Sequence, residues 1–112
     1  MTFNVGIDIE KVSRFGKKDK KLFGKIFSKK ELKNANAQRL AGVFCAKEAV
    51  IKACRPVEKL QLRDIEILHE KSGMPYAAIN SNKISKRNLK ISISHSGDYA
   101  IATAILLVSD KN

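Results

Sequence analysis

The stretch from Leu40 to Cys54 constrains the fold most, because its apolar residues recur with the period of an α-helix. The residues on this spacing are Leu40, Val43, Phe44, Val50, Ile51 and Cys54. Pro56 lacks a backbone N–H and ends the pattern. We therefore expect one long helix over Leu40 to Cys54 whose apolar side packs against a sheet.

Strand patterns surround this helix. Phe3 to Ile9 alternates apolar and polar residues, which predicts a half-buried strand. Further strands are expected over Leu62 to Leu68, Tyr76 to Ile79, Leu89 to Ser94 and Tyr99 to Val108. Ser28 and Glu31 have the spacing of a capping box, which predicts a helix start. The pattern indicates an α+β fold, a mostly antiparallel sheet packed on one long helix, as a single domain over residues 1–112.

The formal net charge is +11, from 22 Lys and Arg against 11 Asp and Glu. Such a charge favours polyanionic partners, and a basic nucleic-acid-binding module is one reading of it. Aromatic residues make up only 6% and no zinc spacing occurs, which argues against that module. A noncatalytic subunit that binds an acidic partner through its basic stretch is a third reading.

The hydropathy of the sequence bears on where in the cell the protein is expected. The longest apolar stretch, Tyr99 to Val108, has about half the length needed to cross a bilayer. The first residues lack the basic start and apolar core of a secretory signal. We expect a cytoplasmic protein.

Three places carry residues suited to chemistry. Asp8 lies within a strand pattern, where aspartate is disfavoured, although it also fits a solvated face or a helix N-cap. Lys47 falls in the middle of the helical apolar stripe, where a charge is costly unless it is paired or bound to a ligand. Glu48 and Lys52 fit either an ordinary surface pair or a site for metal and phosphate. The third place, Ser92 to Tyr99, fits an anion-binding turn or a plain hairpin whose histidine is merely exposed.

In this order, these elements resemble the holo-acyl-carrier-protein synthase family of small 4′-phosphopantetheinyl transferases. The similarity covers nearly the whole chain. It is carried by Gly6-Ile7-Asp8-Ile9-Glu10 with Arg14-Phe15, Leu40-Ala41-Gly42, Lys47-Glu48-Ala49 to Lys52-Ala53, Asp64-Ile65-Glu66-Ile67, Gly73-Met74-Pro75-Tyr76, Ser92-Ile93-Ser94-His95-Ser96 and Tyr99-Ala100.

The resemblance implies a reaction. The chain would transfer the 4′-phosphopantetheine group of coenzyme A to a serine of apo acyl carrier protein, in support of fatty acid biosynthesis. Holo acyl carrier protein and adenosine 3′,5′-bisphosphate would be the products. Asp8 and Glu48 are then the expected ligands of Mg²⁺, an ion that prefers hard oxygen donors. Lys52 would contact the reacting phosphate, and either Glu48 or a metal-bound water would take the serine proton.

Further implied contacts concern coenzyme A and the carrier. The expected coenzyme A-binding residues are Lys47, Lys52, Gly73, Pro75, His95 and Ser96. The acidic carrier would dock on Arg14, Lys17, Lys18 and Lys21. The family forms trimers with sites between subunits, so His95 would serve another subunit's Asp8 and Glu48.

The chain departs from the family at a few positions. Val43 stands where many members have arginine, and Arg39, one turn earlier, is a candidate replacement. Cys54 to Glu58 is short and lacks the usual glycines, and Met74 stands where lysine is frequent. The carrier-protein range and the contacts to the pantetheine arm stay open.

Overall fold

The computed structural model describes residues 1–16 and 20–109. Its elements, with η marking short 3-10 helices, are β1 (Thr2–Lys11), η1 (Val12–Phe15), α1 (Lys20–Ile26), α2 (Lys29–Leu32), α3 (Ala37–Cys54), η2 (Leu62–Asp64), β2 (Ile65–His69), β3 (Pro75–Ile79), η3 (Lys86–Asn88), β4 (Leu89–Ser96) and β5 (Tyr99–Val108). The predicted α+β class, with one long helix against antiparallel strands, is confirmed.

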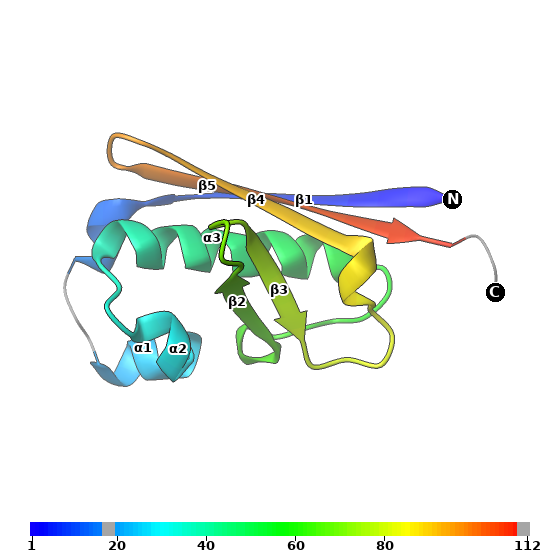
Figure 1. Cartoon of the computed structure of the whole chain (residues 1–112), viewed down its shortest axis with the longest axis horizontal. Coiled ribbons are helices and arrows are strands. Elements are labelled where there is room, and N and C mark those ends of the chain that lie inside the picture. Colours follow the sequence, from blue (N-terminus) through cyan, green and yellow to red (C-terminus); the bar gives the residue numbers. More distant parts are fainter. Residues whose placement is uncertain (17–19, 110–112) are drawn as a thin grey trace.

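The described strands form two antiparallel sheets, one in the order β1-β5-β4 and one that pairs β2 with β3. Figure 1 shows the longer sheet along one side of α3 and the β2–β3 pair on the other. The turn between β4 and β5 has two residues, and Gly97 supplies its positive φ of 56°. No helix in the described part of the chain is long and apolar enough to span a membrane.

The helix starts follow local capping chemistry. Asn36 caps α3 by accepting a hydrogen bond from the Arg39 backbone N–H at 2.8 Å, so α3 begins three residues before the predicted Leu40. The capping box of Ser28 and Glu31 is present and starts α2, as predicted. Gly24 lies inside α1.

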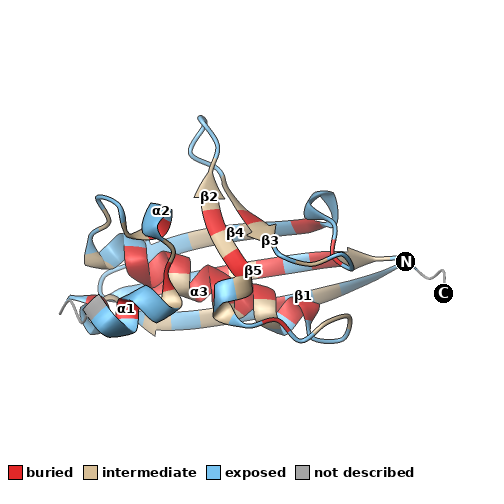
Figure 2. Ribbon diagram, turned by 90° about the horizontal axis from the view of Figure 1, so that it is seen from below, coloured by how far each residue is buried: buried red, intermediate tan, exposed pale blue. Residues whose placement is uncertain are grey.

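The face of β1 that is buried differs from the one that its alternating sequence suggests. An alternating strand usually buries its apolar side, but Phe3, Val5, Ile7 and Ile9 are 54–67% exposed. The opposite side, with Gly6, Asp8 and Glu10, is turned toward the interior: Gly6 is buried and both carboxylates are partly buried. Figure 2 shows exposed and intermediate positions along β1. The strand is therefore half-buried, as expected, but through its polar face.

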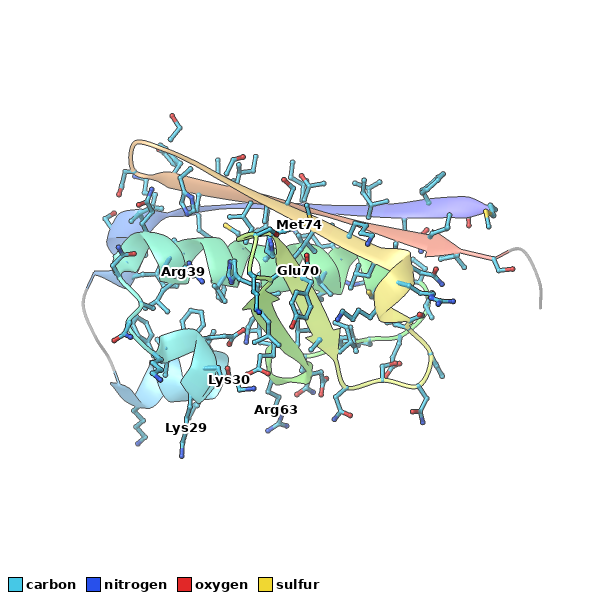
Figure 3. The ribbon with its side chains drawn as sticks, viewed as in Figure 1. Lys29, Lys30, Arg39, Arg63, Glu70 and Met74 are labelled. Carbon is cyan, nitrogen blue, oxygen red and sulfur yellow. The ribbon has the colours of Figure 1, made fainter. Side chains whose placement is uncertain are left out.

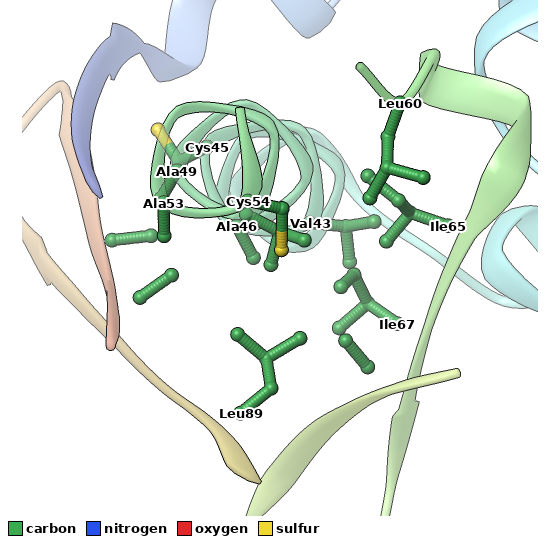
Figure 4. Packing of buried hydrophobic residues seen from close by; sticks show 14 of the residues in the cluster. Val43, Cys45, Ala46, Ala49, Ala53, Cys54, Leu60, Ile65, Ile67 and Leu89 are labelled. Atoms are coloured by element: carbon green, nitrogen blue, oxygen red, sulfur yellow. The ribbon is translucent and has the colours of Figure 1, made fainter. Parts of the chain in front are cut away.

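Small residues explain this orientation. A Cβ on Gly6 would lie 1.9 Å from the Ala49 carbonyl oxygen and 2.8 Å from the Ala53 N, so the β1 backbone rests directly on α3. Strand β5 meets the same helix through fully or nearly fully buried alanines, namely Ala100, Ala102 and Ala104. Figure 4 looks along α3 and shows Cys45, Ala49 and Ala53 toward this sheet, with Val43 and Cys54 toward Ile65 and Ile67.

We predict that Gly6→Ala lowers the free energy of unfolding by about 1–3 kcal/mol or more, because an added methyl overlaps backbone atoms that cannot rotate away. Gly24→Ala is the matched control. It meets no atom within 4 Å in α1 and should raise stability by about 0.5–1 kcal/mol. Urea unfolding measures both. Equal effects of the two substitutions would contradict the close approach of β1 and α3.

Candidate active site

Asp8 lies on the face of β1 that covers α3, and its side chain is 15% exposed. Its Oδ1 lies 3.5 Å from the Lys52 Nζ, which also donates a hydrogen bond to the Ile7 carbonyl at 2.8 Å. Its Oδ2 is buried without a hydrogen-bond partner. A buried carboxylate oxygen without a partner is costly, so this atom is suited to a ligand that supplies positive charge.

Glu10 belongs to the same cluster and was missed from the sequence. Burial raises its pKa, and the negative charges of Asp8 and Glu48 raise it further, while Arg14, its salt-bridge partner, opposes the shift. Burial and the charges of Asp8 and Glu10 also raise the pKa of the Cys45 thiol to about 12. The period-2 alternation, which places Glu10 on the Asp8 face of β1, was the available signal.

These carboxylates fit Mg²⁺ in donor type and charge. Among the described residues, no three His, Cys, Asp or Glu side chains are arranged as a metal site. Mg²⁺ is commonly held by one or two carboxylates, with waters and substrate phosphates as its other ligands. Asp8, whose Oδ2 has no hydrogen-bond partner, lies beside other carboxylates, so the protein has the one or two carboxylate ligands that such a site needs.

Lys52 does not form the ordinary surface pair with Glu48 that was one of the two interpretations of these residues. The described ion pairs join it to Asp8 across the helix–strand contact and do not include Glu48. Glu48 is half-buried one helical turn before Lys52 on α3. Asp8, Glu48 and Lys52 thus lie along the β1 side of this helix.

His95, Gly73 and Pro75 gather on the other side of α3. They line a cavity of about 210 Å³ together with Arg39, Gly42, Val43, His69 and Ile93. The His95 Nε2 donates to the Gln38 carbonyl at 2.9 Å. A Cβ on Gly42 would lie 2.9 Å from the same Nε2, so only glycine leaves room for this ring. Ser96 is exposed and, by strand alternation, lies on the opposite face of β4 from His95.

The two groups of predicted residues are not brought together within one chain. Strands β1 and β4 are the two edges of the sheet, with β5 between them and α3 beneath. Asp8 lies on the first edge and His95 on the second.

Lys47 was predicted to bind coenzyme A, and the structure gives it a different environment. Its side chain is 1% exposed and its Nζ forms a 2.7 Å ion pair with the buried Glu31. The same Nζ donates to the Ile26 carbonyl at 2.7 Å. The lysine is satisfied inside the protein and does not reach a surface cavity, so we leave it out of the coenzyme site.

The docking residues are only partly described. Arg14 is exposed at the end of η1 and pairs with Glu10, and Lys21 is exposed on α1. Lys17 and Lys18 lie outside the described residues. Arg39, considered as a replacement for Val43, contacts the Nδ1 of His69 at 2.9 Å through its Nη2. Sequence reasoning gave His69 no role, since a contact across 30 positions leaves no local signal.

The fold and this site define a small α+β protein whose carboxylate and lysine edge is suited to phosphate chemistry. Residues 4–104 match the 4′-phosphopantetheinyl transferase superfamily. The chain belongs to this family. That result confirms the resemblance and leaves the nucleic-acid-binding alternative without support.

Individual relatives and solved structures support the same family assignment. The chain is 41% identical to the holo-[acyl-carrier-protein] synthase of Caldicellulosiruptor saccharolyticus over 94% of this chain and 96% of that protein. It is 37% identical to that of Fusobacterium nucleatum, over 96% and 100% respectively. The structure is similar to the Helicobacter pylori synthase in complex with coenzyme A, with a TM-score of 0.76 and 29% identity over 92% of this chain and 99% of that one. A Chronobacterium ammoniagenes ACPS–CoA complex gives a TM-score of 0.78 at 26% identity over 97% and 99%.

We predict that Lys47→Met destabilises the fold by about 3–5 kcal/mol, because it leaves the Glu31 carboxylate buried without its partner. Lys52→Met is the control on the same helix. Its lysine is 47% exposed, so its loss should cost less than about 1 kcal/mol. Urea unfolding measures both. A small cost for Lys47→Met would contradict the structural role of this lysine.

Proposed function

We propose that this chain transfers the 4′-phosphopantetheine group of coenzyme A to a serine of apo acyl carrier protein, in support of fatty acid biosynthesis. The products are holo acyl carrier protein and adenosine 3′,5′-bisphosphate. Family membership supports the reaction class. The observation that carries the proposal in this chain is the Asp8 carboxylate, held beside Lys52 with one buried oxygen free for a ligand.

Each residue of this edge has a part in the proposal. Asp8 and Glu48 would hold Mg²⁺, and the ion would supply charge neutralisation for the phosphates of coenzyme A. Lys52, exposed at the surface, neutralises charge on the phosphate under attack and on the departing nucleotide. Glu48 is the residue that we assign as acceptor of the serine proton.

The test is intact-mass analysis of apo carrier protein after incubation with the enzyme, coenzyme A and Mg²⁺. We expect the mass of one phosphopantetheine to be added, and we expect Asp8→Asn to abolish the transfer. Mg²⁺ should also raise the melting temperature of the wild type, because it offsets repulsion among the clustered carboxylates that raises the pKa of Glu10. This shift should disappear in Asp8→Asn.

Glu70→Gln is the matched control, since it removes an exposed carboxylate from the end of β2. It should keep both the transfer activity and the Mg²⁺ shift. Transfer by Asp8→Asn at the wild-type rate would exclude Asp8 from the reaction. An unmodified carrier with the wild type would end the proposed function.

We also propose that the chain acts as a homotrimer with sites shared between subunits. The outer face of the β1-β5-β4 sheet supports this. It exposes Phe3, Val5, Ile7, Ile9, Tyr99, Ile101 and Ile105, each 36–67% accessible. Apolar patches of this kind mark protein–protein contacts. The separation of Asp8 from His95 within one chain is a second support.

Shared sites predict complementation. Glu48→Ala and His95→Ala should each be nearly inactive alone, whereas mixed subunits should regain partial activity, because some interfaces then pair two intact halves. The activity is measured after mixing, and subunit exchange is followed by native mass spectrometry. Mixed trimers that stay inactive would place both residues in one subunit's site.

Docking of the acidic carrier is proposed on the basic surface that begins at Arg14 and continues to Lys21. The net charge of +11 supports long-range attraction of an acidic protein. Arg14 also pairs with Glu10, so it links the docking surface to the carboxylate cluster. We retain Lys17 and Lys18 as part of this proposal.

A further inference from the structure

A second, larger cavity adjoins the one that His95 lines. It has a volume of about 410 Å³ and is bordered by α2, the loop before α3, the first turns of α3 and the end of β2. Its basic lining residues are Lys30, Lys33, Arg39 and His69. Arg39, Val43 and His69 line both cavities, so they stand where the two meet. Figure 3 labels Arg39 on α3 and Lys30 on α2, two of the elements that border this space.

The positive charge at the border of the two cavities is energetically unfavourable in the protein alone. Arg39 lies in the first turn of α3, where the helix dipole disfavours a cation. Its guanidinium contacts the His69 ring, and burial together with this neighbouring charge lowers the pKa of His69. Within residues 1–16 and 20–109, no carboxylate lies within ion-pair distance of Arg39.

The nearest acid does not compensate this charge. Glu31 lines the larger cavity, but one of its oxygens pairs with the Lys47 Nζ and the other accepts the Ile67 backbone N–H at 2.7 Å. Val43, the other residue that both cavities share, adds no charge. The arrangement therefore gathers Lys30, Lys33 and Arg39 around a space whose lining carboxylate, Glu31, is already paired.

We propose that Arg39 and His69 bind a phosphate monoester. This inference rests on the proposed function for the identity of the ligand, which would be the 3′-phosphate on the ribose of coenzyme A. A phosphate monoester carries a charge of about −1.5 to −2 at neutral pH, and the planar guanidinium of arginine matches its oxygens. Coenzyme A has one such group, and the adjoining cavity holds Gly73, Pro75 and His95, its proposed nucleotide contacts. Arg39 and His69 are thereby specificity residues that distinguish coenzyme A from 3′-dephospho-coenzyme A.

Calorimetric titration with two nucleotides tests the pair. Adenosine 3′,5′-bisphosphate carries the monoester at the 3′ position, whereas adenosine 5′-phosphate lacks it. We expect the wild type to prefer the bisphosphate, and Arg39→Gln to reduce that preference by roughly tenfold or more, as the loss of a hydrogen bond to a charged group does. His69→Gln should reduce it in the same direction.

Lys29→Gln is the matched control. It removes one positive charge from α2, but Lys29 is exposed and lines neither cavity. The control should keep the wild-type preference. If the wild type binds both nucleotides equally, or if Arg39→Gln weakens both equally, the pair does not recognise the monoester.

Kinetics separates this inference from the proposed function. Arg39→Gln should raise the KM for coenzyme A while leaving kcat and the KM for 3′-dephospho-coenzyme A nearly unchanged. If Arg39 had only a structural role, the substitution would change the kinetic constants for both substrates together. That result would overturn the inference. If the wild type transfers nothing but still prefers the bisphosphate in an Arg39-dependent way, the proposed function fails while the monoester site stands.

Discussion

The direct contact of α3 with the β1-β5-β4 sheet is the constraint on which the other features depend. Gly6 brings the β1 backbone against Ala49 and Ala53, and Gly42, two turns before Ala49 on the same face of the helix, makes room for the His95 ring of β4. Because the sheet comes so close, Lys52 on the helix can reach both the Ile7 carbonyl and the Asp8 carboxylate. Larger side chains at this contact would separate the lysine from the aspartate. The packing of the core and the geometry of the site therefore have one cause.

The same contact decides which face of β1 is turned outward. Asp8 and Glu10 can approach α3 only if Phe3, Ile7 and their apolar neighbours point away from it. The exposed apolar face is thus a consequence of placing the carboxylates beside the helix. Covering that face with further copies would stabilise a small chain. The exposed apolar face and the carboxylate edge are linked through one strand.

Local patterns predicted much of this structure, and long-range contacts account for what they missed. The helix over Leu40 to Cys54 and the Ser28 capping box were predictable because periodicity and capping act within a few residues. The orientation of β1 was not, since hydropathy favours burying Ile7 and only the close approach of Gly6 reverses it. Lys47 was recognised as a costly charge, but its partner Glu31 lies in a different helix and leaves no signal near it. Glu10 could have been found from the alternation that identified Asp8.

Two lysines of α3 have different roles, since Lys47 stabilises the fold and Lys52 belongs to the candidate active site. Lys52 lies at the surface beside Asp8, whereas Lys47 is enclosed and joins α3 to α2 through Glu31. Glu31 extends this connection to β2, because its second oxygen holds the Ile67 backbone two residues before His69. The buried pair therefore fixes how α2, α3 and β2 meet, and Arg39 and His69 contact each other across that junction. A charge that binds no ligand itself thus sets the geometry of the cavity where we place the phosphate monoester.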